Sequence, residues 1–149
     1  RSGTEAVPSL AGLGAAARLA RTGLAQMPLV AGRRDRLEML LLGMGTKVSV
    51  NGSGQPRLPN TASVSFHGLA ADAIVRALDS QDICASAGAA CHSGNVEPSG
   101  TMRAMGLPLE VAMGAVRFSL SRTTTDAEID TVAETVPRVM ASVRQSTIV

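Results

Sequence analysis

Cys91 is the residue of this sequence whose surroundings best suit a chemical role. It lies in the stretch 86–94 (SAGAACHSG), where small residues surround the thiol and a polar stretch follows. A nucleophilic cysteine needs solvent access and a stabilised thiolate, and His92 beside it could supply positive charge. A chance cysteine in a surface loop would show the same pattern, so the residues alone leave both interpretations open.

The other cysteine and the histidines do not form a metal-binding pattern. Cys84 follows Ile83 in an apolar stretch and is predicted to be a small core residue. Cys84, Cys91, His67 and His92 show neither C-x-x-C nor H-x-x-x-H spacing, so no metal site is predicted. His67 is interpreted as a hydrogen-bonded residue at a strand end, and His92 as a solvated loop residue rather than a base.

Arg117 is the second residue with a chemical interpretation. In a predicted strand from 115 to 121, the period of two places Val116, Phe118 and Leu120 on one face and Arg117 on the other. A planar guanidinium can bind a carboxylate through two parallel hydrogen bonds. An arginine that extends from a sheet edge into solvent is the equal alternative.

A third candidate is the turn at residues 1–4 (RSGT), which precedes a predicted helix. Backbone N–H groups and the Thr4 hydroxyl converge there, as they do in phosphate-binding turns. Four residues of this kind are weak evidence by themselves. The glycines at 12–14 lack the preceding strand that a dinucleotide-binding fingerprint requires.

The elements that must position these residues follow from apolar periodicity. Helical spacing predicts helices at 7–24, 28–43, 71–78, around 102, and 125–143, and the last of these opens with Thr125 and Glu128 in capping-box spacing and contains Pro137. Alternation predicts strands at 47–51, 61–66, 82–86 and 115–121. The stretch 88–100 has no apolar period and is predicted to be an exposed loop.

Helices interleaved with short strands predict an α/β fold, an α+β sandwich in which helices pack on one face of a small mixed sheet. The apolar face of that sheet would carry Phe66 and Phe118. The helices ending at Leu78 and Val143 would cover it.

Composition narrows the functional classes. The chain has 149 residues, 45% of them hydrophobic, and a net charge of +2, which suits one domain with a core. With no Trp or Tyr and two Phe, base stacking and nucleic-acid binding are not expected. The longest apolar run, 39–44, is too short for a membrane span.

Two cysteines and no signal-like start favour a cytoplasmic location. Because it begins at Arg1, the chain is expected to be a piece of a longer protein.

Taken together, five segments resemble the C-terminal portion of a cysteine desulfurase, a pyridoxal-phosphate-dependent enzyme of the class V aminotransferase group. They follow in order at 1–8, 57–66, 88–99, 103–107 and 116–124. The resemblance implies the C-terminal domain of a fold-type I enzyme. Residues 1–24 would then be an interdomain turn and long linker helix, and 25–149 a small domain with a mobile catalytic loop at 88–100.

The same resemblance implies roles for the three candidate residues. Cys91 would attack the sulfur of L-cysteine bound to the cofactor, leaving alanine and a Cys91 persulfide. Arg117 would bind the substrate's α-carboxylate. Thr4 would reach the phosphate of pyridoxal phosphate across the interface of a homodimer. The other partners implied are the enzyme's large cofactor-binding domain and a sulfur-acceptor or scaffold protein, whose pathway the sequence leaves open.

One departure bears on activity. The family's Schiff-base lysine has no match here, because the only lysine, Lys47, lies in a predicted strand with Val48 and Val50. This chain alone is therefore expected to be inactive. Two alternatives stay open: a selenocysteine lyase, which His92 suggests, and a non-enzymatic module that relays a persulfide or binds a scaffold.

Overall fold

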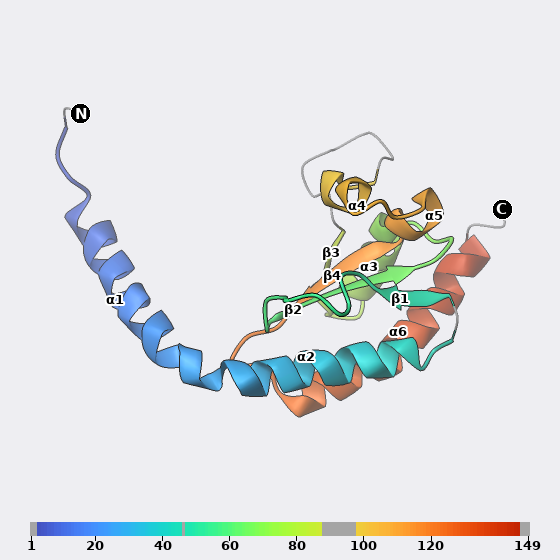
Figure 1. Ribbon diagram of the computed structural model, residues 1–149, viewed down its shortest axis with the longest axis horizontal. Coiled ribbons are helices and arrows are strands. Elements are labelled where there is room, and N and C mark those ends of the chain that lie inside the picture. Colours follow the sequence, from blue (N-terminus) through green and yellow to red (C-terminus); the bar gives the residue numbers. More distant parts are fainter. Residues whose placement is uncertain (1–2, 46, 88–97, 147–149) are drawn as a thin grey trace.

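The alternating apolar stretches form neighbouring strands of one sheet. The computed structural model describes residues 3–45, 47–87 and 98–146. Its strands are β1 (Val48–Val50), β2 (Thr61–Phe66), β3 (Ser86–Ala87) and β4 (Ala115–Ser119). They form a sheet of order β1-β2-β4-β3 (Figure 1). The α/β fold class is confirmed, but all three strand pairs are antiparallel, so the strand directions are not mixed as predicted.

Six α-helices and one 3-10 turn accompany the sheet in the described residues. They are α1 (Val7–Gly23), the 3-10 turn η1 (Leu24–Gln26), α2 (Met27–Leu42), α3 (Ala71–Asp79), α4 (Gly100–Ala104), α5 (Leu109–Ala112) and α6 (Asp126–Ser146). The helix predicted around residue 102 is thus present as α4. It begins at Gly100, which the sequence had placed in a loop. Within the described ranges, none of these helices combines the length and apolarity needed to cross a bilayer.

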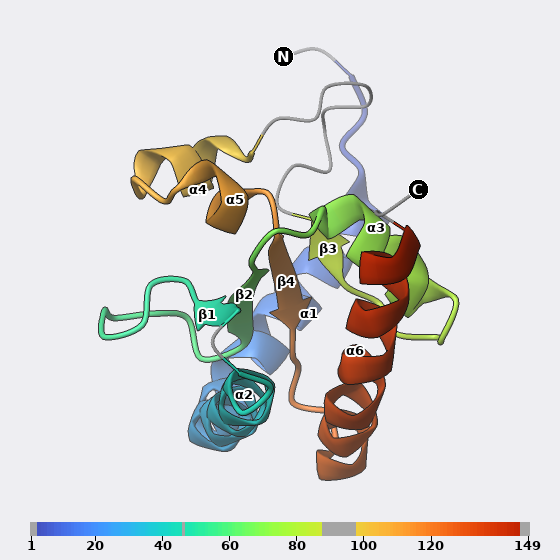
Figure 2. The same cartoon turned by 90° about the vertical axis from the view of Figure 1, so that its right-hand side faces the viewer.

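Helices α2, α3 and α6 lie together on one side of the sheet (Figure 2). The side chains between them and the strands are closely packed, with Phe66 only 1% exposed and Phe118 only 4% exposed. Burying one such side chain contributes roughly 1.5–3 kcal/mol. The prediction that helices ending near Leu78 and Val143 cover the apolar face is confirmed.

Local signals explain where the main helices begin and end. Pro28 occupies the first turn of α2, and Gly43 is its C-cap. The predicted capping box at the start of α6 is confirmed: the Thr125 N–H donates to Glu128 Oε2 at 2.6 Å, and the Glu128 N–H donates to Thr125 Oγ1 at 3.2 Å. The hydrogen bond from the Thr125 backbone holds the pKa of the Glu128 carboxyl below its usual value.

Ion pairs join the helices to each other and to the loop between β1 and β2. Arg33 pairs with Asp126 at 3.0 Å and so links α2 to α6. Arg57 binds Glu38 through two hydrogen bonds of 2.7 and 2.9 Å, and Glu38 is only 7% exposed. These bonds raise the pKa of Arg57 and fix the loop against α2.

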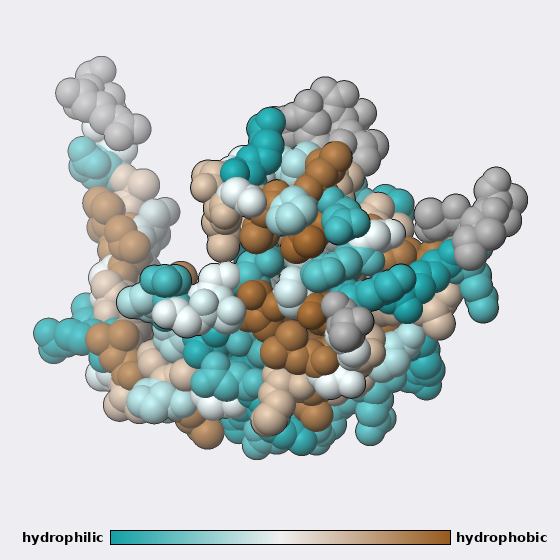
Figure 3. All heavy atoms as spheres, turned by 45° about the vertical axis from the view of Figure 1, so that its right-hand side comes forward, coloured by the Kyte–Doolittle hydropathy of each residue, from teal (hydrophilic) through white to brown (hydrophobic). Residues whose placement is uncertain are grey.

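Helix α1 stands apart from this packed body (Figure 1). Its apolar residues repeat at helical spacing as predicted, yet Leu10 is 55% exposed and Leu13 is 67% exposed. Figure 3 shows the same apolar surface along the projecting helix. The periodicity therefore predicted the helix correctly, while the described residues of this chain do not cover its apolar face.

Cys84 is not the core residue that its apolar neighbours predicted. It is exposed, and β3 begins at Ser86, four residues later than expected. After α3 the chain turns through Asp82, which has a φ of 58°. Ile83 then takes the buried position at 8% exposure. Since neighbouring extended residues point in opposite directions, Cys84 faces solvent.

Gly114 allows the close approach of the segment before β4 to the end of β2. A Cβ atom at this position would lie 2.0 Å from the Phe66 carbonyl oxygen, a backbone atom that cannot move aside. We expect Gly114→Ala to lower the free energy of unfolding by about 3 kcal/mol or more. Gly32→Ala is the matched control, because no atom lies within 4 Å of its added Cβ. That helical change should stabilise by about 0.5–1 kcal/mol. Urea unfolding measures the free energy of unfolding of both variants. Equal changes in the two variants would contradict the close approach at Gly114.

Candidate functional site

The face of the sheet opposite α2, α3 and α6 carries a row of polar side chains beside a small apolar cluster at Ala115. In β2, Ala62, Val64 and Phe66 are in the core, so Ser63 and Ser65 point to the other side. The same alternation in β4 buries Val116 and Phe118 and leaves Arg117 and Ser119 on the polar face. The alternation that buries apolar side chains on one face of these strands therefore places polar side chains on the other face.

Arg117 lies near the centre of this polar face and is exposed, as the period of two predicted. Its Cα partners on the two flanking strands are Ser63 of β2 and Ser86 of β3. The guanidinium Nη2 donates to Ser86 Oγ at 3.4 Å. Among the described residues, no carboxylate forms an ion pair with Arg117. The geometry thus presents a positive fork, with two hydroxyls beside it, to an external anion.

A buried hydrogen-bond network supports the polar face next to Arg117. Asn51 is 6% exposed, and its Nδ2 donates to Ser63 Oγ at 3.1 Å and to Ser65 Oγ at 2.9 Å. Ser65 is fully buried, and its hydroxyl donates back to Asn51 Oδ1 at 3.1 Å. The amide therefore fixes both serines, and the position of Ser63 beside Arg117 is structurally determined.

His67 is hydrogen bonded at the end of β2, as predicted. Its Nε2 lies 2.8 Å from Ser49 Oγ, and its backbone N–H donates to the carbonyl of Lys47 at 2.9 Å. Within the described ranges, no group of three or more His, Cys, Asp or Glu side chains is placed to hold a metal ion. His67 is thus accounted for by its contacts in the sheet.

The remaining predicted site residues do not join Arg117 in the described structure. Cys91 and His92 lie outside the described residues, as does most of the stretch 88–100. Thr4 is exposed in the segment before α1, which Figure 1 shows well apart from the sheet. The chain therefore does not itself bring Thr4 and Arg117 together.

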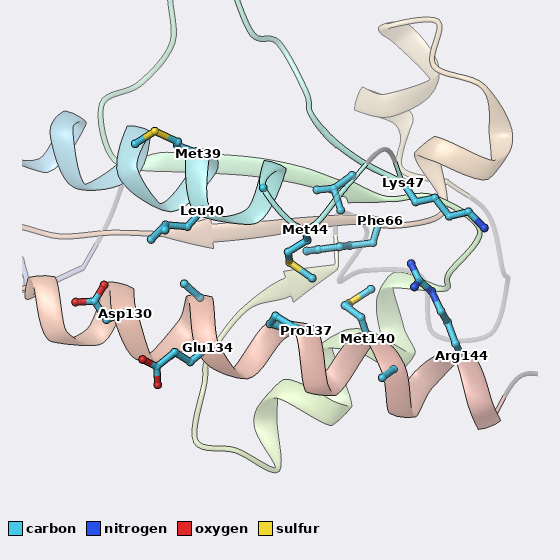
Figure 4. A pocket seen from close by; sticks show the side chains of 14 residues that line it. Met39, Leu40, Met44, Lys47, Phe66, Asp130, Glu134, Pro137, Met140 and Arg144 are labelled. Carbon is cyan, nitrogen blue, oxygen red and sulfur yellow. The ribbon is translucent and has the colours of Figure 1, made fainter.

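The chain's single lysine borders a groove between α2 and α6. Lys47 immediately precedes β1 and is exposed. It lines a groove of about 720 Å³ on the helix side, between α2 and α6 (Figure 4). Phe66 and Met140 also line this groove, so it faces the core side of β2. Because Thr4 stands apart from the sheet and Lys47 lines the groove rather than joining Arg117, the described residues do not by themselves fit pyridoxal phosphate.

Comparison with known proteins assigns the chain to a family. A family model described as aminotransferase class-V matches residues 1–132. The chain belongs to the class-V aminotransferase family. Within it, a cysteine desulfurase from Trichormus variabilis is 44% identical over 144 residues, which are 97% of this chain and 36% of the relative. A cysteine desulfurase from Cereibacter sphaeroides is 47% identical, over 97% of this chain and 37% of the relative.

A solved structure shows the same fold. The X-ray structure of a NifS-like protein from Rickettsia africae matches with a TM-score of 0.81 and 27% identity, over 95% of this chain and 36% of that protein. This class-V aminotransferase chain thus spans about a third of the length of the relatives it matches. The resemblance found in the five sequence segments is confirmed at the level of the family.

Sequence reasoning did not find the serines beside Arg117. The alternation in β2 indicated that Ser63 and Ser65 share a face. However, the pairing of Ser63 and Ser86 with Arg117 depends on strand order and register. That information lies in the packing of distant segments rather than in any local pattern.

The Asn51 network gives a stability prediction. Asn51→Ala would leave the fully buried Ser65 hydroxyl without its amide partner, so we expect the free energy of unfolding to fall by about 2 kcal/mol. Ser119→Ala, on the exposed part of the same polar face, should change it by less than about 0.5 kcal/mol. Chemical denaturation would measure both variants. A neutral Asn51→Ala would show that the network does not fix the polar face.

Proposed function

We propose that this chain is the C-terminal part of a pyridoxal-phosphate-dependent cysteine desulfurase. Relatives that carry this name are 44–47% identical to it over nearly its whole length. The observation that carries the proposal is the state of Arg117, an exposed cation without a carboxylate partner among the described residues. Such a group is available for the α-carboxylate of an amino-acid substrate.

The position of Cys91 in the chain supports its role as the sulfur acceptor. Cys91 follows Ala87, where β3 ends, by four positions in the chain, and β3 also carries Ser86 beside Arg117. Four residues at full extension span at most about 14 Å between Cα atoms. After the stretch that contains Cys91, the Ser99 hydroxyl caps α4 by accepting the Met102 N–H at 3.2 Å. The thiol is therefore tethered on both sides to elements of this fold.

The proposed reaction transfers one sulfur atom. The Cys91 thiolate attacks the sulfur of L-cysteine, so that an S–S bond forms and the substrate's Cβ–S bond breaks. The electron pair of the broken bond stays with Cβ, which takes up a proton to become the methyl group of L-alanine. Cysteine and the Cys91 thiol thus become alanine and the Cys91 persulfide, which passes to an acceptor protein.

Other parts of the enzyme must supply what this chain lacks. A large domain would provide the Schiff-base lysine, since Lys47 faces the groove on the helix side. Pyridoxal phosphate, when bound there, supplies an electron sink for the substrate's carbon atoms. In a homodimer, Thr4 would approach the phosphate of the neighbouring subunit's cofactor. The exposed apolar stripe of α1 is consistent with packing against further protein.

The roles of the two cysteines separate in a direct experiment on the complete enzyme. Cys91→Ser should abolish both the release of alanine and the gain of one sulfur atom, roughly 32 Da, on Cys91, because a hydroxyl is a far poorer nucleophile toward sulfur. Mass spectrometry of the digested enzyme after exposure to L-cysteine, with an alanine assay, measures both. Bound cofactor should be unchanged, which absorbance checks.

Cys84→Ser is the matched control for this experiment. Cys84 is a free and exposed cysteine, so it tests whether thiol exposure alone is sufficient for persulfidation. This variant should keep full activity and lose less than about 0.5 kcal/mol of stability, because the side chain is not in the core. A persulfide on Cys84, or full turnover by Cys91→Ser, would rule out the proposed role of Cys91.

A further inference from the structure

The polar face of the sheet carries two hydroxyls whose hydrogen-bonding roles are set by their neighbours. Ser63 Oγ accepts a hydrogen bond from Asn51 Nδ2 at 3.1 Å. On the other side of β4, Ser86 Oγ accepts from Arg117 Nη2 at 3.4 Å. A serine hydroxyl has one proton to donate and two lone pairs to accept. Each serine oxygen therefore already accepts one hydrogen bond. Within the described residues, neither serine O–H group donates to an acceptor.

These groups form a row across three strands. Ser63 of β2 and Ser86 of β3 are the Cα partners of Arg117 on its two sides. Side chains that face each other in this way in an antiparallel sheet have Cβ atoms about 4.5–5.5 Å apart. Both serines are half-buried, whereas Arg117 is exposed. The row therefore offers two O–H donors beside a guanidinium fork.

We infer that Ser63 and Ser86 bind the substrate's α-carboxylate together with Arg117. The inference rests on the proposed function and adds two specificity-determining residues to it. A carboxylate has about four lone-pair sites, and Arg117 alone fills two of them through its fork. The flanking hydroxyls donate to the remaining sites. Asn51 is a positioning residue, because its amide holds Ser63 with the O–H directed away from the network.

Physical alternatives for these serines are weaker. If their role were only structural, their protons would be expected to bond within the protein, as the Ser65 hydroxyl does to Asn51 at 3.1 Å. Small size alone would be met equally well by alanine, which occurs in both strands, as Ala62 in β2 and Ala87 in β3. Two hydroxyls beside a cation that has no carboxylate partner among the described residues thus point to an anionic ligand.

The test uses two inhibitors that differ only in the carboxylate. L-alanine carries the charged group, and L-alaninamide replaces it with a neutral amide. In the complete enzyme, Ser63→Ala and Ser86→Ala should each raise the inhibition constant of L-alanine about ten-fold or more, because each removes one hydrogen bond to a charged group. The inhibition constant of L-alaninamide should change less than twofold. The KM for L-cysteine should rise together with the inhibition constant of L-alanine. The fall in kcat should be smaller than the rise in KM.

Matched variants separate this role from general damage to the sheet. Ser119→Ala, in β4, makes the same change on the same face of the sheet and should leave both inhibition constants unaltered. Ser86→Thr keeps the hydroxyl and should restore the constant for L-alanine to within about twofold of wild type. Thermal unfolding checks each variant, and if Ser63→Ala does not fold, Ser86→Ala and Ser86→Thr decide the question.

The outcomes distinguish this inference from the function on which it rests. A complete wild-type enzyme that releases no alanine from cysteine would contradict the proposed function, and the inference with it. An active wild type whose Ser86→Ala variant retains its inhibition constant for L-alanine would contradict the serine row alone. Equal weakening of L-alanine and L-alaninamide would also overturn it, since the serines would then not recognise the carboxylate.

Discussion

The alternation of side chains along β2 and β4 is the constraint on which the rest of the structure depends. Because neighbouring residues of a strand point to opposite faces, placing Val64, Phe66 and Phe118 against the helices forces the residues between them onto the opposite face. A slip of one residue in register would bury Arg117 in the core and expose Phe118. The same strand register is thus needed both to pack the core and to expose Arg117.

The helices make this requirement strict. α2, α3 and α6 fill one side of the sheet, and ion pairs such as Arg33 with Asp126 hold α2 and α6 together. The Arg57–Glu38 pair fixes the loop that leads into β2. On the polar side, Asn51 links β1 to the serines of β2 through buried hydrogen bonds. Arg117 is consequently presented from a rigid platform, as a group that orients a substrate must be.

Local sequence patterns were sufficient for much of this fold. Alternation predicted β2 and β4 and the outward direction of Arg117, and Thr125 with Glu128 predicted the start of α6. Cys84 was misplaced because its apolar neighbours do not reveal the turn at Asp82. The serine row could not be predicted, since it depends on the order β2-β4-β3, which distant segments establish. Cys91 was singled out from its neighbours in the sequence, and its position lies outside the described residues.

The central claim is that Arg117, on the polar face of the sheet, binds the carboxylate of an amino-acid substrate. A crystal structure of the complete enzyme with L-alanine bound tests it most directly. The account predicts the alanine carboxylate on the polar face, within about 3 Å of the Arg117 guanidinium nitrogens. A carboxylate bound elsewhere, with Arg117 directed into solvent or paired with a carboxylate of the protein, would contradict it.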